Sequence, residues 1–90
     1  MRRVELTPRF ERSFKRLSPH VQTAARKALR NLIEQPHAKS LNLEPVVGRP
    51  GFFTIRATLA FRVLLRREED EDGVCYHAED VDTHRIYRRK

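Results

Sequence analysis

The segment from Leu43 to Arg67 alternates apolar and cationic residues with a period of two, and this pattern limits the possible folds more than any other. β-Branched and aromatic residues recur at every second position, interrupted by a Gly/Pro-rich stretch at 48–51 and a short turn at 58–60. Successive side chains of a strand point to opposite faces of a sheet. The segment therefore predicts a short strand and then two strands joined by a tight turn.

The alternation also assigns side chains to the two faces. Arg56, Arg62 and Arg66 share one face, and Glu44 points outward while Leu43 points inward. The opposite face is apolar and is expected to meet the core through Phe53, Ile55, Ala57, Phe61, Val63 and Leu65. If these strands are neighbours, a single carboxylate lies among arginines on the outward face.

Two helices are predicted before these strands. Thr7-Pro8 and Ser18-Pro19 each combine a capping residue with a proline at the first helical position. The first helix, ending near Leu17, has an apolar stripe at i, i+4 and i+7 made of Phe10, Phe14 and Leu17. The second helix ends before Pro36 and has an apolar face of Val21, Ala24, Ala25, Ala28, Leu29, Leu32 and Ile33.

The remaining segments complete an α+β pattern. Residues 2–6 alternate as a first strand, 68–73 read as a charged hairpin loop, and 85–90 as a short basic tail. The last strand, 74–83, changes its inward parity between Ala78 and Val81, which a β-bulge would reconcile. The order predicts an N-terminal strand, an antiparallel two-helix hairpin on one sheet face and a mostly antiparallel sheet, all in one domain spanning 1–90.

Charge restricts the classes of partner. The chain carries 19 Lys and Arg against 12 Asp and Glu, for a net charge of +7. Such a balance favours polyanions, with nucleic acid first and an anionic membrane surface second. An apolar run long enough to cross a bilayer and an apolar signal segment are both missing, so a cytoplasmic location is expected. The single cysteine, Cys75, is expected to be a buried strand residue.

No cofactor or metal is expected from the sequence. His20, His37 and His77 have no spacing typical of metal ligands.

Several short segments, in this order, resemble the RelE/ParE toxin superfamily of bacterial toxin–antitoxin modules. They are Thr7-Pro8-Arg9-Phe10, Leu43-Glu44-Pro45, Gly48-Arg49-Pro50-Gly51, Phe61-Arg62-Val63-Leu64 and the closing segment 82–88. The resemblance covers the whole chain and implies the same α+β fold and an antitoxin partner. It also implies one of two activities. RelE-like and YoeB-like members are endoribonucleases that cut mRNA in the A site of the 30S ribosomal subunit without a metal, whereas ParE-like members poison DNA gyrase.

The YoeB-like pattern implies roles for four residues. Glu44, in a Glu-Pro dipeptide, corresponds to the general base, and Arg62 to the arginine that stabilises the transition state. His84 and Tyr87 correspond to the histidine and aromatic residue that complete the site, and either is a candidate general acid. The paired lysines of RelE itself are absent. Arginines expected to contact RNA are Arg49, Arg56, Arg66, Arg85 and Arg88.

Each assignment has a plainer alternative. Glu44 could be paired with an arginine on a solvated strand, and Arg62 could be a generic phosphate contact. His84 could be a surface residue, and Tyr87 could serve only as a packing anchor. The alternative functions are therefore a gyrase poison and an RNA-binding module that has lost catalysis.

Overall fold

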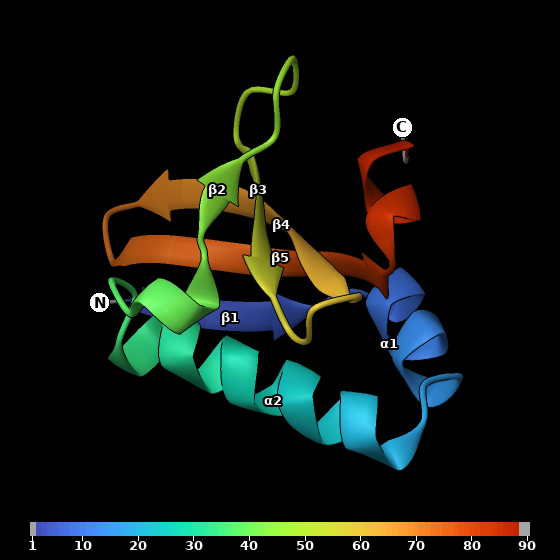
Figure 1. Ribbon diagram of the computed structural model, residues 1–90. Helices are drawn as coiled ribbons and strands as arrows, with labels where there is room; N and C mark the ends of the chain where they lie inside the picture. The colour runs from blue at the N-terminus through green and yellow to red at the C-terminus, as the bar shows by residue number, and fades with distance from the viewer. Residues whose placement is uncertain (1, 89–90) are drawn as a thin grey trace.

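The computed structural model describes residues 2–88, without the side chain of Arg88, as two helices packed on one face of a five-stranded sheet (Figure 1). The elements are β1 (Arg2–Leu6), α1 (Pro8–Lys15), α2 (Pro19–Glu34), η1 (Lys39–Leu41), β2 (Glu44–Pro45), β3 (Phe52–Arg56), β4 (Arg62–Asp70), β5 (Gly73–Asp82) and η2 (His84–Arg88). The sheet order is β1-β5-β4-β3-β2, in which β1 runs parallel to β5 and the other neighbours are antiparallel. The predicted α+β fold is confirmed.

Capping and proline residues define the helices as the sequence indicated. The Thr7 hydroxyl accepts a hydrogen bond from the Phe10 amide at 3.1 Å, and Pro8 occupies the first turn of α1. α1 ends at Lys15, so Leu17 lies in the connection rather than in the helix. α2 ends at Glu34, two residues before Pro36. Between residues 2 and 88, neither helix is long and apolar enough to span a membrane.

The core lies between the helices and the apolar face of the sheet. Phe53 pairs with Leu65 and Ile55 with Val63, so these four side chains share one face. This register confirms the predicted parity of β3 and β4. The buried core residues are Phe10, Ala25, Ala28, Leu32, Leu41, Ile55, Val63, Leu65, Tyr76, Ala78 and Val81.

The predicted bulge in the last strand is present. Leu65 pairs with Ala78, but the preceding Leu64 pairs with Asp80, which leaves Glu79 as the extra residue of β5. Because of this shift, Tyr76 and Ala78 on one side of the bulge and Val81 on the other all reach the same core.

Residues 68–73, predicted to be a charged hairpin loop, are mostly strand. β4 continues to Asp70 and β5 begins at Gly73, so only two residues form the turn. Gly73 has φ of 120°, a conformation that favours glycine. Arg3 on β1 pairs with Asp70 at 2.7 Å, and its guanidinium holds the pKa of that carboxyl below its ordinary value. Cross-strand pairing and this ion pair therefore extend the hairpin through its acidic end.

The alternation of apolar residues reaches back to Leu41, which would begin the short strand there, and the structure corrects this expectation. Lys39–Leu41 form a turn of 3-10 helix, and Asn42 follows with φ of 48°, in the left-handed region that asparagine tolerates. Regular pairing starts only at Glu44, opposite Thr54. Leu41 is nevertheless buried in the core, as its apolar character suggested.

The second face of the sheet is partly covered, because the described part of the predicted basic tail, up to residue 88, folds back over it. Residues 84–88 form η2, and Ile86, which is 0% exposed, packs with Val46, Leu64 and Phe52 in a second small apolar cluster. This face also carries more than one carboxylate, since Asp82 on β5 lies directly opposite Arg62. The expectation of a single carboxylate among arginines on this face was therefore wrong, because β5 adds Asp82 to it.

Candidate functional site

Glu44 and Arg62 meet on the second face of the sheet, where β2, β3 and β4 run side by side (Figure 1). Glu44 pairs with Thr54 across β2 and β3, and Arg62 begins the next strand. The Arg62 Nη2 atom lies 3.2 Å from the Glu44 Oε1 atom. The structure thus brings together the two residues to which the resemblance gave the base and the transition-state contact.

Arg62 is held by three partners. Its Nε donates to the Thr54 hydroxyl at 3.0 Å, and its Nη2 donates to the Asn42 carbonyl at 2.8 Å as well as to Glu44. The side chain is only 12% exposed, whereas that of Glu44 is 53% exposed. Within residues 2–88, the Nη1 group of Arg62 has no hydrogen-bond partner. The guanidinium is therefore fixed in direction and keeps donors for an added oxygen ligand.

Tyr87 joins the same group through Thr54. The two hydroxyl oxygens lie 3.3 Å apart, and Tyr87 is half-exposed on η2 next to the buried Ile86. His84, at the start of η2, is exposed, and no hydrogen bond or ion pair connects it to another described residue. The structure therefore brings Glu44, Arg62 and Tyr87 together through Thr54, and it does not bring His84 to them. We call these four, Glu44, Thr54, Arg62 and Tyr87, the hydroxyl–arginine cluster.

Thr54 and Asn42 are the site residues that the sequence reasoning missed. The alternation of β3 already placed Thr54 on the same face as Arg56, so its position was available from parity. Asn42 acts through its backbone carbonyl, which the left-handed conformation directs at Arg62. A backbone contact of that kind leaves no signal in the spacing of side chains.

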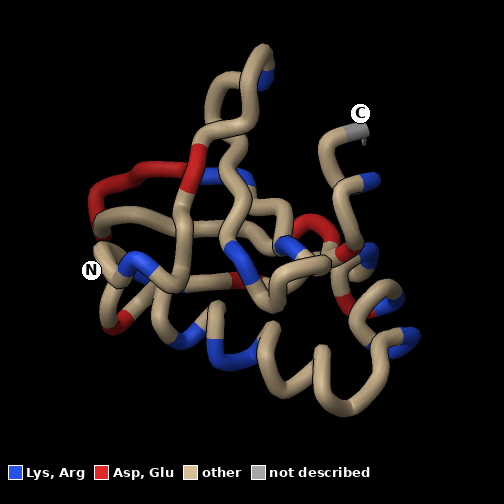
Figure 2. The backbone as a smooth tube through the Cα atoms, viewed as in Figure 1, with Lys and Arg blue, Asp and Glu red and all other residues tan. Residues whose placement is uncertain are grey.

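Two of the arginines expected to contact RNA, Arg56 and Arg49, lie on β3 and in the loop that precedes it. Arg56 is exposed and pairs directly across from Arg62. Arg49 lies in the loop between β2 and β3, with its guanidinium 4.1 Å from the centre of the Phe52 ring. Figure 2 shows this loop extending from the body of the protein, with a basic residue near its tip. Both side chains are in position to widen a cationic surface around the cluster.

Arg66 and Arg85 are paired with carboxylates. Arg66 contacts Glu79 at 3.1 Å and Glu68 at 3.7 Å, and Arg85 contacts Asp82 at 3.4 Å. Figure 2 shows acidic residues along the far end of the β4–β5 hairpin. The side chain of Arg88 lies outside the described residues. Arg66 and Arg85 therefore carry less uncompensated charge than the sequence suggested.

The hydroxyl of Thr54 connects Arg62 to Tyr87, so its removal has a specific expected cost. Thr54→Val keeps the volume of this buried side chain but leaves Arg62 Nε without its acceptor. We expect the free energy of unfolding to fall by about 1–3 kcal/mol, the range for an unsatisfied buried polar group. Urea denaturation measures this change. Thr23→Val, at an exposed position of α2, is the control, and equal effects of the two substitutions would contradict the assignment.

The cluster has the groups that phosphodiester chemistry requires. An exposed carboxylate is a potential proton acceptor, an oriented guanidinium binds phosphate oxygens, and a phenolic hydroxyl is a potential proton donor. All three are on one sheet face that the two long helices do not cover (Figure 1).

Solved structures of bacterial toxins have the same fold. The YoeB/ParE toxin from Agrobacterium tumefaciens superimposes with a TM-score of 0.73 at 17% identity, covering 91% of this chain and 98% of that one. YafQ from E. coli gives 0.71 at 13% identity, covering 96% and 97%. A chain of the RelBE2 toxin–antitoxin complex from Mycobacterium tuberculosis gives 0.67 at 23% identity, covering 90% and 95%. No protein-family model matches the sequence, and no curated protein does.

Proposed function

We propose that the protein is the toxin of a type II toxin–antitoxin pair, and that it stops translation by cutting mRNA on the ribosome. The observation that carries the proposal is the 3.2 Å pairing of Glu44 with an Arg62 that Thr54 and Asn42 hold in place. The shared fold with YoeB/ParE, RelE and YafQ toxins supports the toxin role. Glu44, Arg62 and Tyr87 would be the catalytic residues.

The proposed reaction uses the ribose 2′-hydroxyl as nucleophile. Glu44 accepts the 2′ proton as the oxygen attacks the adjacent phosphorus, and Arg62 stabilises the negative charge of the phosphorane. The bond from phosphorus to the 5′ oxygen then breaks, and that oxygen takes a proton from a general acid. The products are a 2′,3′-cyclic phosphate and a 5′-hydroxyl. DNA lacks the nucleophile and would not be cut.

Tyr87 is the better placed of the two candidate acids. Its hydroxyl is linked to Arg62 through Thr54, and the buried Ile86 fixes the segment on which it lies. His84 makes no described contact with the cluster. We therefore assign proton donation to Tyr87, and leave to His84 at most a contact with RNA from the rim.

The partners follow from charge and from the uncovered face. A net charge of +7 favours the sugar–phosphate backbone of mRNA, with exposed Arg56 and loop residue Arg49 as additional contacts. An antitoxin segment that folds on binding would cover the same surface and block it. Ribosomes are the expected place of action, which puts the protein in the cytoplasm.

The experiment that tests this function compares RNA and DNA damage in the same cells. Expression of the protein should produce cuts within translated codons, mapped by primer extension, and the same cuts should form on programmed ribosomes in vitro. DNA-damage signalling with intact message would instead support a gyrase poison, the alternative suggested by the ParE part of the neighbour's name. Intact RNA together with the absence of DNA-damage signalling would exclude both the ribonuclease and the gyrase poison.

A further inference from the structure

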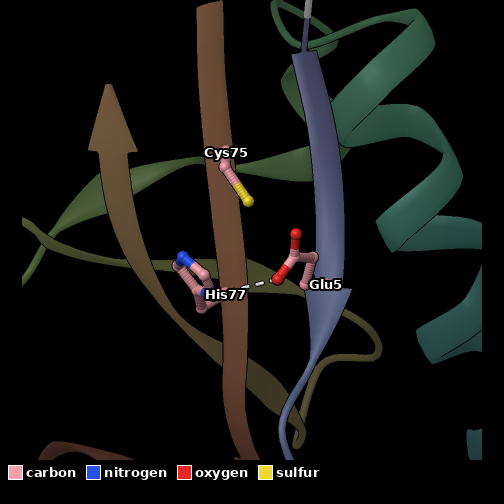
Figure 3. A group of neighbouring side chains, drawn as sticks. All are labelled: Glu5, Cys75 and His77. Atoms are coloured by element: carbon pink, nitrogen blue, oxygen red, sulfur yellow. Dashed lines mark ion pairs between the residues drawn. The ribbon is translucent and has the colours of Figure 1, made fainter. Parts of the chain in front are cut away.

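A second group of reactive side chains lies at the other edge of the same sheet, on β1 and β5. Glu5, Cys75 and His77 each offer one ligand atom, and these atoms all lie within 4.8 Å of one another (Figure 3). Cys75 and His77 are two residues apart on β5 and so share a face, while the parallel register of β1 places Glu5 beside His77. The proposed ribonuclease reaction uses none of the three.

A fourth residue holds the imidazole in the orientation that a metal ligand needs. The Nε2 atom of His77 lies 3.2 Å from Oε1 of Glu68 on β4, and its Nδ1 atom lies 3.8 Å from Oε1 of Glu5. If Nε2–H donates to Glu68, the lone pair is on Nδ1 and points toward the other two ligands. Metal-bound histidines are typically oriented by a carboxylate in this way.

From this geometry we propose that Glu5, Cys75 and His77 bind a divalent zinc-type ion, with Glu68 as the residue that positions His77. Thiolate, imidazole and carboxylate are the ligands that Zn²⁺ takes, and three protein ligands leave a fourth position for water. A tetrahedral site with ordinary bond lengths places ligand atoms roughly 3.3–3.8 Å apart. The present separations are at most 4.8 Å, so side-chain shifts of about 1 Å, which the exposed Glu5 on the edge strand makes most easily, would bring the three atoms to these positions.

The surroundings favour a cation at this place. Cys75 is 1% exposed, so an ion would be shielded on one side, and it would enter over the exposed Glu5. Two arginines lie beside the group, and both are paired with carboxylates. Arg3, opposite Cys75, contacts Asp70 at 2.7 Å, and Arg66, opposite His77, contacts Glu79 at 3.1 Å and Glu68 at 3.7 Å. The bound ion would connect the edge strand β1 to β5 and so stabilise the N-terminal part of the sheet.

Binding of Co²⁺, used as a coloured probe for zinc, tests this site on protein without a histidine tag. We expect one ion per chain, with a thiolate-to-cobalt charge-transfer band and the intense visible bands of tetrahedral geometry. Cys75→Ser should abolish the charge-transfer band. Glu5→Gln and His77→Gln should lower the affinity at least about tenfold, and Glu68→Gln by about 10- to 100-fold.

Two substitutions outside the group are the matched controls. His37→Gln and Glu11→Gln replace an exposed histidine and an exposed glutamate elsewhere in the chain and should leave cobalt binding unchanged. Zn²⁺ should also raise the Tm of the wild type and of both controls, and at the same Zn²⁺ concentration it should raise that of Glu5→Gln by less. If His77 only contacts Glu5 and Glu68 and binds no metal, there would be no cobalt band and no rise in Tm with Zn²⁺. That result would overturn the proposal. Retention of full affinity by His77→Gln would overturn it as well.

Discussion

Arg62→Ala is expected to lower the rate of mRNA cleavage by about 100- to 1,000-fold, because one preorganised donor to a developing oxyanion has an effect of that size. Arg62 is the centre of the cluster: it contacts Glu44, Thr54 and the Asn42 carbonyl, and it is the group that would face the phosphorane. Single-turnover cleavage on programmed ribosomes, at saturating protein, separates this loss from weaker RNA binding.

The control for the loss of one positive charge is Arg30→Ala. Arg30 is exposed on α2, on the opposite side of the sheet from the cluster (Figure 1). The Arg30→Ala variant should cleave mRNA at a rate within a few-fold of the wild-type rate under the same conditions. If Arg62→Ala and Arg30→Ala reduce the rate equally, the effect of Arg62 is general electrostatic attraction, and its catalytic role is contradicted.

Ile55→Ala should lower the free energy of unfolding by about 2–5 kcal/mol. Ile55 is 0% exposed, and the residues before and after it in β3, Thr54 and Arg56, lie on the opposite face of the sheet. Truncation removes buried apolar surface and leaves a cavity in a small core. Each kcal/mol should lower the Tm by about 4–8 °C in a domain of this size.

Leu59→Ala is the matched control for this measurement. Leu59 is an apolar residue of similar volume in the β3–β4 turn, but it is 93% exposed. Its removal should change the free energy of unfolding by less than about 0.5 kcal/mol. Comparable losses for the two variants in urea denaturation would show that Ile55 does not occupy the packed position described.

The sequence was most informative where local periodicity and packing agree. The alternation around β3 and β4 placed Ile55 and Val63 in the core and Arg56 and Arg62 on the other face, and the register has this arrangement. The parity change in β5 indicated a bulge, which occurs at Glu79. These features depend only on which face each residue buries, so the pattern of residue types contains them.

The errors occurred where contacts distant in sequence decide the local conformation. Asn42 takes a left-handed conformation and hydrogen-bonds Arg62, which ends the expected strand before it begins. The basic tail forms η2 because Ile86 finds a buried place against Leu64. Acidic residues up to Asp70 remain in β4 because they pair with β5 and with Arg3.

The candidate site was predictable in part for the same reason. Glu44 and Arg62 were expected on one face, but the spacing did not show that their strands, β2 and β4, lie on either side of β3 in one sheet. The group around His77 was not expected at all, because its ligands come from β1 and β5, and only the parallel pairing of these strands brings Glu5 beside His77. A search for ligand spacing within one segment does not detect such a site.

The central claim is that Glu44 is the base of an RNA-cleaving site, and single-turnover cleavage by Glu44→Gln on programmed ribosomes tests it most directly. Glu71→Gln, at the exposed turn between β4 and β5, removes the same charge elsewhere and is the comparison. A general base contributes about 100- to 10,000-fold, so Glu44→Gln should be slower than wild type by at least about 100-fold while Glu71→Gln cleaves normally. Cleavage by Glu44→Gln at the rate of Glu71→Gln would contradict the account.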